Sequence, residues 1–261
     1  MTIDDALASL AGTDRLLVAL DFDGTLSPLV DDPMSARMAP TARAAVDALA
    51  AAPDTTVALV SGRSLSDLRV IAEHGDDSVL LLAGSHGAEH WTPADGPRHP
   101  AAGEPTPDER AERDRLRAAA EALVADVPGA WIEPKTFGFA VPSRTVPPAA
   151  RADLHARVDA LMATQAPQWR RRTGHHIVEY AFREEGKDTA IAWLRAYTGA
   201  TAVLFAGDDV TDEDALGSLG PGDVGVRVGA GETAASLRVE GIPELAQMLV
   251  RLAHERARTR E

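Results

Sequence analysis

Five consecutive residues, Asp21-Phe22-Asp23-Gly24-Thr25, carry side chains suited to phosphoryl transfer and come directly after a short apolar run. A carboxylate such as Asp21 can attack phosphorus as a nucleophile, and Asp23 can protonate the leaving oxygen. Gly24 allows the chain to turn, and Thr25 offers a hydroxyl and a main-chain N–H to a phosphoryl oxygen. The competing interpretation is a helix N-cap, because Asp and Thr both favour that position.

A second acidic cluster follows the apolar run 202–206 and contains Asp208, Asp209 and Asp212. If these carboxylates pack beside the first pair, they raise one another's pKa values unless a hard cation neutralises them. Oxygen ligands in a chain without cysteine favour Mg²⁺. A solvated acidic loop that caps the next helix is the alternative, but it explains Asp208 poorly, because Asp208 adjoins an apolar strand.

Two further sites offer groups that bind phosphate. Lys187 follows Gly186 at an expected helix start, where the helix dipole disfavours a cation, so an anionic partner explains it better. Ser61, Gly62 and Arg63 follow another apolar run and supply a hydroxyl and main-chain N–H groups. As a bare tripeptide, this second signal is weak.

These residues stand where strands of a parallel sheet would end. Short β-rich runs alternate with Ala-rich segments of helical spacing, which is typical of a doubly wound α/β sheet whose ligands bind at the carboxyl ends of the strands. The expected strands of this sheet are 15–20, 56–60, 79–83 and 202–206, and two further short elements, 224–228 and 242–253, close the chain.

The composition changes to Pro, Gly, Ala and charged residues over 92–107, which marks a boundary. The sequence beyond this boundary is typical of a small α+β unit. Its expected elements are helices over 108–125 and 147–163 and strands over 131–141, 169–172 and 176–182. We therefore expect a core domain of residues 1–106 and 183–261 and an inserted domain of residues 107–182.

Composition excludes several classes of protein. The 261 residues are 45% hydrophobic and 25% charged, so the chain is expected to fold. A net charge of −14 repels nucleic acid and anionic lipid, and with no cysteine the chain has no thiol nucleophile or zinc-thiolate site. We expect a cytoplasmic protein, a monomer or weak oligomer, with no nucleic-acid or membrane partner.

Taken together, the four sites resemble the motifs of haloacid dehalogenase-like phosphohydrolases, in the family's order and over the whole chain. The matching positions are Asp21 to Thr25, Ser61, Lys187 and Asp208 to Asp212. The resemblance implies a doubly wound parallel-sheet, Rossmann-like core. It also implies that the segment inserted between the second and third motifs is a cap over the site.

Several segments look more specifically like trehalose-6-phosphate phosphatases. These are Leu26-Ser27-Pro28-Leu29, Ser61-Gly62-Arg63, 207–214 and Gly84-Ser85-His86-Gly87-Ala88-Glu89. The resemblance implies that a small-molecule sugar phosphate binds to Thr25, Gly62, Arg63 and His86 in the core and to Glu133, Lys135, Arg144 and Glu179 in the cap.

The chain also departs from this family in the cap. Pro142-Ser143 stand where the family usually has His-Tyr, and Ala181-Phe182 stand where it has a basic residue and Pro. Asp188 follows Lys187 where Gly is usual. A phosphatase for a related disaccharide, pseudo-disaccharide or glycosyl-glycerate phosphate is therefore the alternative enzyme.

The resulting prediction is a Mg²⁺-dependent phosphatase for trehalose 6-phosphate. Asp21 is the expected nucleophile and Asp23 the expected acid and base, while Lys187 and Ser61 hold the phosphoryl group. The residues expected to hold or support the metal are Asp21, Asp23, Asp208, Asp209 and Asp212. A receiver-like signalling module and a non-catalytic sugar-phosphate sensor are the other classes considered, and the second acid at Asp23 disfavours both.

Overall fold

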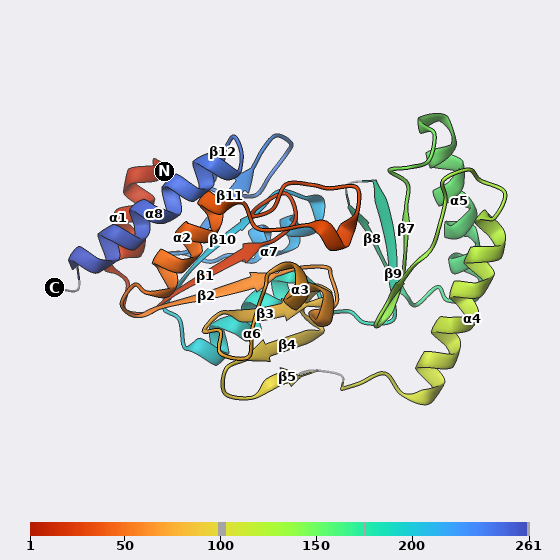
Figure 1. Ribbon diagram of the computed structural model, residues 1–261, viewed down its shortest axis with the longest axis horizontal. Coiled ribbons are helices and arrows are strands. Elements are labelled where there is room, and N and C mark those ends of the chain that lie inside the picture. The colour runs from red at the N-terminus through yellow and green to blue at the C-terminus, as the bar shows by residue number, and fades with distance from the viewer. Residues whose placement is uncertain (99–102, 175, 260–261) are drawn as a thin grey trace. The chain divides into compact units, whose positions relative to one another are not determined.

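The structure, a computed structural model, describes residues 1–98, 103–174 and 176–259. The chain forms two compact units, drawn in Figure 1. The core unit consists of Met1–Pro100 and Glu185–Glu261, and the cap unit of Ala101–Glu184.

The core unit is built on one sheet with the strand order β12-β11-β10-β1-β2-β3-β4-β5. All neighbouring strands are parallel except at the β4 edge, where β4 runs antiparallel to both β3 and β5. The strands are β1 (Leu16–Asp21), β2 (Thr55–Val60), β3 (Leu81–Gly84), β4 (Glu89–Thr92), β5 (Gly96–Arg98), β10 (Ala202–Gly207), β11 (Val224–Val228) and β12 (Leu237–Val239). The expected doubly wound α/β core is confirmed.

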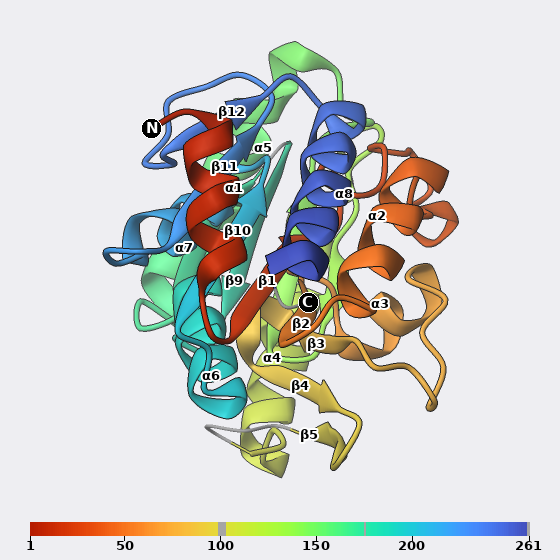
Figure 2. The ribbon, with the colours of Figure 1, turned by 90° about the vertical axis from the view of Figure 1, so that its left-hand side faces the viewer.

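Helices cover both faces of this sheet, because alternate side chains of a strand point to opposite sides. In β1, Leu16, Val18 and Leu20 pack with α1, α2, α3 and α8, whereas Leu17 and Ala19 pack with α6 and α7. The helices around the sheet are visible in Figure 2. They are α1 (Ile3–Gly12), α2 (Pro40–Ala50), α3 (Leu65–Ile71), α6 (Lys187–Thr198), α7 (Glu213–Ser218) and α8 (Ile242–Thr259).

The position of β1 explains why the polar residues gather. It lies between β10 and β2, with Leu20 paired to Ala206 and Asp21 paired to Val60. The residues that follow these three strands therefore leave the sheet at one edge. Short 3₁₀ turns follow three strands of this sheet: η1 (Pro33–Ser35) comes after β1, η2 (Ser85–Gly87) after β3 and η3 (Val210–Asp212) after β10.

The cap unit is a four-stranded antiparallel sheet with two helices on one face. Its strand order is β6-β7-β9-β8. The elements are α4 (Pro107–Val124), β6 (Glu133–Lys135), β7 (Gly138–Pro142), α5 (Pro148–Gln165), β8 (Arg170–Gly174) and β9 (Ile177–Ala181). Phe139, Val141, Val178 and Tyr180 form the apolar face, which packs against α4 and α5.

The expected single strand over 131–141 is wrong, because this segment forms the β6–β7 hairpin. Its turn contains Thr136 and Phe137, between Lys135 and Gly138, which pair across the hairpin. Gly138 lies so close to β9 that a Cβ there would stand 1.8 Å from the carbonyl oxygen of Tyr180. Lys135, Thr136 and Gly138 are the polar and glycine residues that mark this turn in the sequence.

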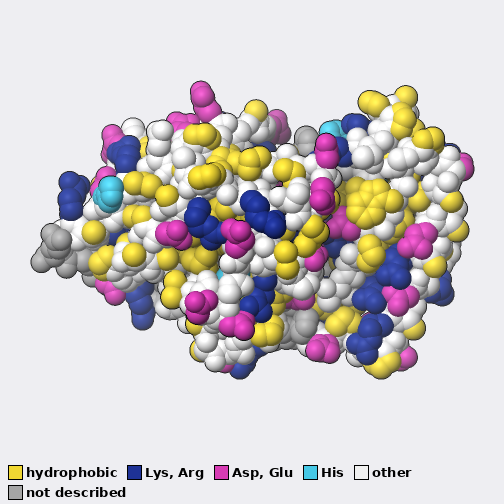
Figure 3. Space-filling view, viewed as in Figure 1, with side chains coloured by type: hydrophobic (Ala, Val, Ile, Leu, Met, Phe, Trp, Pro, Cys, Tyr) yellow, Lys and Arg dark blue, Asp and Glu magenta, His cyan; other side chains and the backbone are white. Residues whose placement is uncertain are grey.

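On the face drawn in Figure 3, Lys and Arg side chains are interspersed with Asp and Glu, so the net negative charge is not gathered into one patch there. Among the helices within the described residues, none has the length and apolar character that a bilayer span requires.

Candidate active site

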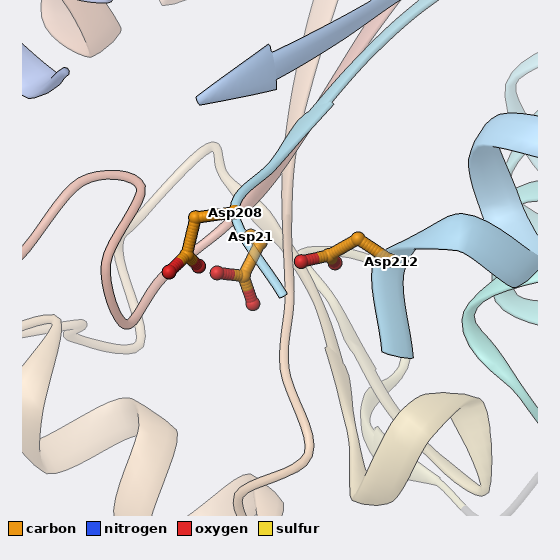
Figure 4. A group of neighbouring side chains, drawn as sticks. All are labelled: Asp21, Asp208 and Asp212. Atoms are coloured by element: carbon orange, nitrogen blue, oxygen red, sulfur yellow. The ribbon is translucent and has the colours of Figure 1, made fainter. Parts of the chain in front are cut away.

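Three carboxylates converge at the carboxyl edge of the core sheet. Asp21 ends β1, Asp208 follows β10, and Asp212 ends the turn η3. One oxygen of each lies within 4.8 Å of the others, and Figure 4 shows their carboxylates pointing toward one another. Of the two acidic clusters predicted to pack together, the structure therefore brings Asp21, Asp208 and Asp212 into one group.

Lys187, the first residue of α6, reaches this cluster from the adjoining helix. Its Nζ donates to Asp21 Oδ1 and to Asp212 Oδ1, both at 2.6 Å. The Lys187 side chain is only 3% exposed. A cation at this helix start is accounted for by the two carboxylates that it binds.

Burial shapes the electrostatics of the cluster. Burial raises the pKa of Asp21 well above its usual value, and the nearby Asp212 and Asp208 add to this against the opposing effect of Lys187. Burial, and then Asp212, raise the pKa of Asp208 to about 6. Burial alone would lower the pKa of Lys187, but Asp21 and Asp212 raise it above its usual value.

The net charge of this cluster decides whether its residues suit a divalent cation. Three carboxylates face one ammonium group, so the cluster holds an excess of negative charge, and keeping that charge in a buried place costs free energy. A divalent cation would relieve that cost, and an all-oxygen donor set suits Mg²⁺. The site fits a divalent cation.

The turn after Asp21 is shaped by its contact with Asp208. Gly24 has φ +85°, and a Cβ there would stand 2.1 Å from Asp208 Oδ2. Thr25 is fully buried, and its Oγ1 lies 3.4 Å from Asp208 Oδ1. Only glycine permits this close approach of the β1 turn to the carboxylate.

Asp23 is bound by Arg63. The Arg63 Nε donates to Asp23 Oδ2 at 2.6 Å and its Nη2 donates to Oδ1 at 2.7 Å. Two residues predicted to act on the substrate are thus brought together as an ion pair. The roles of both stay predictions.

The Ser61–Arg63 loop is held by the neighbouring η2 turn. His86 N–H donates to Ser61 O at 2.9 Å, and Ser85 N–H donates to Arg63 O at 2.6 Å. Ser85 and His86 have φ values of +48° and +56°, which are strained for non-glycine residues. The His86 ring occupies the space that a Cβ on Gly62 would need, at 2.6 Å. His86 therefore packs directly on the predicted phosphate loop.

Asp209 behaves differently from its neighbours. Its Oδ1 accepts from Val210 N–H at 2.7 Å, which caps η3, whereas Asp212 Oδ2 accepts from Asp209 N–H at 2.9 Å. Among the described residues, the carboxylate group that could hold a metal contains Asp212 but not Asp209. The assignment of Asp209 as a supporting residue stays a prediction.

In the cap unit, the predicted sugar-binding residues fall into two places. Lys135 Nζ donates to Glu133 Oε1 at 2.8 Å on β6, and Glu179 on β9 is separated from Glu133 by Ala140 of β7. Arg144 lies in the turn after β7, where its carbonyl oxygen accepts from Arg151. The sheet therefore groups Glu133, Lys135 and Glu179, while Arg144 lies outside it.

Two residues that support the site were not predicted. Arg227 Nη1 donates to Asp209 O at 2.9 Å and to Glu213 at 3.1 Å, which ties the acidic loop to β11. Glu89 accepts from Leu65 N–H at 3.2 Å and from the hydroxyl of Ser85. A lone charge inside the apolar strand β11 is the signal that could have revealed Arg227.

Comparisons with known proteins identify the family of the chain. The profile of the trehalose-phosphatase family matches residues 19–240. The trehalose-phosphate phosphatase of Mycobacterium ulcerans (strain Agy99) is 33% identical over 275 residues, an alignment that covers 97% of this chain and 66% of that protein. The chain therefore spans just under two thirds of the length of this relative.

Solved structures match the fold across both units. The C. albicans trehalose-6-phosphate phosphatase C-terminal domain superposes with a TM-score of 0.84 at 19% identity, covering 97% of each chain. A haloacid dehalogenase-like hydrolase from B. subtilis superposes with a TM-score of 0.60 at 15% identity, covering 89% of this chain and 98% of the other. Because the family profile matches most of the sequence and the fold agrees, the chain belongs to the trehalose-phosphatase family, a family of phosphatases with the haloacid dehalogenase-like fold.

Proposed function

We propose that this protein hydrolyses trehalose 6-phosphate to trehalose and phosphate, with Mg²⁺ and through a phosphorylated Asp21. The observation that carries the proposal is the buried contact of Lys187 with Asp21 and Asp212, beside Asp208. A buried carboxylate held by an ammonium group is suited to meet an incoming phosphoryl group, because the same ammonium can hold a phosphoryl oxygen.

In the first step, an Asp21 carboxylate oxygen attacks phosphorus in line with the sugar oxygen. The new bond joins Asp21 to phosphorus, and the bond from phosphorus to the sugar oxygen breaks. Asp23 gives its proton to that oxygen, so the sugar leaves as a neutral alcohol. Lys187 and Ser61 bind oxygens of the group in transfer.

In the second step, a water molecule attacks phosphorus and the bond to Asp21 breaks. Asp23, which lost its proton in the first step, accepts one from this water. Phosphate leaves and Asp21 is regenerated. Asp21 therefore acts as the nucleophile, and Asp23 acts first as the acid and then as the base.

Asp21, Asp208 and the main-chain carbonyl of Asp23 would hold the Mg²⁺, and Asp212 supports Lys187. The cation, when bound, offsets negative charge on the phosphoryl oxygens. Every proton transfer in the mechanism is assigned to Asp23.

A panel of phosphate esters tests the proposal. Phosphate release with Mg²⁺ is measured for trehalose 6-phosphate, related disaccharide phosphates, a glycosyl-glycerate phosphate and p-nitrophenyl phosphate. Trehalose 6-phosphate should give the highest kcat/KM, and Asp21→Asn should abolish turnover while the protein keeps its fold. No phosphate release from any sugar phosphate would overturn the proposal.

The related disaccharide phosphates remain the second candidate substrates because of the residues beside the predicted sugar site. Ala181 pairs with Gly138, next to Lys135, and Phe182 packs against Phe137 and Trp169. Neither side chain offers a polar group to a hydroxyl. A higher kcat/KM for another disaccharide phosphate in the same panel would select this second candidate.

A further inference from the structure

The cap sheet has a polar face opposite α4 and α5. Side chains alternate across a strand, so the residues between those of the apolar face point the other way. We define the polar face by Glu133 and Lys135 of β6, Ala140 of β7, Glu179 of β9 and Arg172 of β8. Arg172 is not among the residues that the sequence motifs predict to bind the sugar, the phosphate or the metal.

The strand register places four of these residues in one row. Glu133 pairs with Ala140, Ala140 pairs with Glu179, and Glu179 pairs with Arg172. Directly paired residues of antiparallel strands have their side chains on the same face. The row therefore runs from Glu133 to Arg172 across all four strands, with only the small Ala140 between the two glutamates.

We infer that Arg172 is a further specificity-determining residue, which binds sugar hydroxyls at the end of this row. The inference rests on the proposed function. At roughly 4.8 Å between strands, the row spans about 14 Å, which suits two linked hexose rings better than one.

The polar face offers both acceptors and donors of hydrogen bonds. The carboxylates of Glu133 and Glu179 lie on this face together with the cations of Lys135, Arg172 and Arg170, the last of which pairs with Ala181 in the register. A sugar hydroxyl can donate to a carboxylate and accept from a guanidinium at the same time. A face that carries carboxylate acceptors beside cationic donors can therefore bind several hydroxyls of one polyol.

The neighbouring arginines have structural partners. Arg171 points to the opposite face, where its Nε donates to Asp159 Oδ1 at 2.6 Å and its Nη1 donates to Thr173 at 2.7 Å. Arg170 donates to the carbonyl oxygen of Glu184. The pleat therefore separates Arg171 from Arg170 and Arg172, and of the three only Arg172 stands opposite Glu179 in the strand register.

The test compares Arg172→Ala with the matched control Arg171→Ala. For Arg172→Ala, kcat/KM for the preferred sugar phosphate should fall roughly 10- to 100-fold, the usual effect of losing a hydrogen bond to a charged group. The value for p-nitrophenyl phosphate should change far less. Inhibition by free trehalose should weaken by the same factor, while inhibition by inorganic phosphate stays constant.

The control and a conservative variant separate recognition from folding. Arg171→Ala should lower Tm without changing the ratio of the two kcat/KM values. Arg172→Lys, which keeps the charge and one donor, should recover part of the loss, and it serves as the test if Arg172→Ala does not fold. Equal losses on both substrates, or unchanged trehalose inhibition, would overturn the inference. Absence of sugar-phosphate hydrolysis in the unmutated protein would overturn the proposed function as well.

Discussion

Arg63 holds both carboxylate oxygens of Asp23, with Nε to Oδ2 at 2.6 Å and Nη2 to Oδ1 at 2.7 Å. A two-pronged guanidinium–carboxylate contact fixes the orientation of both side chains. Both are partly shielded, with 15% of the Arg63 side chain and 27% of the Asp23 side chain exposed. The residue predicted to bind substrate thus contacts the proposed acid and base.

This contact predicts that Arg63 positions Asp23. In Arg63→Ala, kcat for a sugar phosphate should fall about 10-fold, because a poor leaving group depends on a well-placed proton donor. The fall for p-nitrophenyl phosphate, whose leaving group needs little protonation, should be much smaller. Arg63→Lys should recover little, because an ammonium lacks the planar fork. An equal loss on both esters would instead favour direct binding of phosphate by Arg63.

The carboxylate cluster predicts a dependence on divalent cations. Exhaustive chelation should abolish phosphate release, Mg²⁺ should restore it, and Ca²⁺ should restore little because its coordination is longer and looser. In the absence of substrate, added Mg²⁺ should raise Tm, and this rise should shrink in Asp208→Asn. The exposed Asp214 on α7 provides the matched control, since Asp214→Asn should keep the full Mg²⁺-dependent rise. Full activity after chelation would contradict the assignment.

The burial of His90 predicts that the folded protein loses stability in acid. Its ring is buried and stacked on Trp193 at 3.8 Å, and neither ring nitrogen has a hydrogen-bond partner within the described parts of the chain. Burial lowers the pKa of His90 to about 4. In the unfolded chain the pKa of His90 is about 6.5, so the unfolded chain binds a proton that the folded protein excludes. The stability of the folded protein therefore falls as the pH drops from about 6.5 toward 4.

The variant His90→Phe keeps the ring contact but does not titrate. Between pH 7 and pH 5, the unmutated protein should lose about 2 kcal/mol more unfolding free energy than this variant, by linkage to the shifted pKa. Urea unfolding at both pH values measures the difference. Parallel losses in the two proteins would show that His90 does not carry the effect.

The hydrogen bonds of Arg256, which lies outside the active site, predict that this side chain contributes strongly to the stability of the fold. This fully buried side chain of α8 donates to the carbonyl oxygens of Leu10, Ala11, Thr13, Pro53 and Asp54 and to the hydroxyl of Thr55. It therefore ties the end of α1 to the segment before β2. Arg256→Ala should reduce the unfolding free energy by about 3 kcal/mol or more, because several buried carbonyls lose their donor.

Arg251 provides the control for Arg256, because it lies on the same helix and forms an exposed ion pair with Asp4. Arg251→Ala should change the unfolding free energy by less than about 1 kcal/mol. Urea unfolding of the two variants compares a buried arginine with an exposed one. Similar small losses in both would refute the structural role of Arg256.

The sequence alone determined the fold class and the acidic centre of the site, because both follow from local patterns. Apolar runs that end abruptly in polar residues predicted parallel strands with Asp21 and Asp208 at their carboxyl ends, and both residues lie there. Lys187 at a helix start indicated an anionic partner, and two carboxylates bind it.

Only the tertiary structure decided which side chains meet, because the contacts join residues far apart in sequence. Arg63 reaches Asp23 across 40 residues, and Lys187 reaches Asp21 across 166. No local pattern specifies where a long side chain points once its strand or helix is packed. The β6–β7 hairpin and the row that ends at Arg172 likewise depend on strand register, which is set by packing across the whole cap sheet.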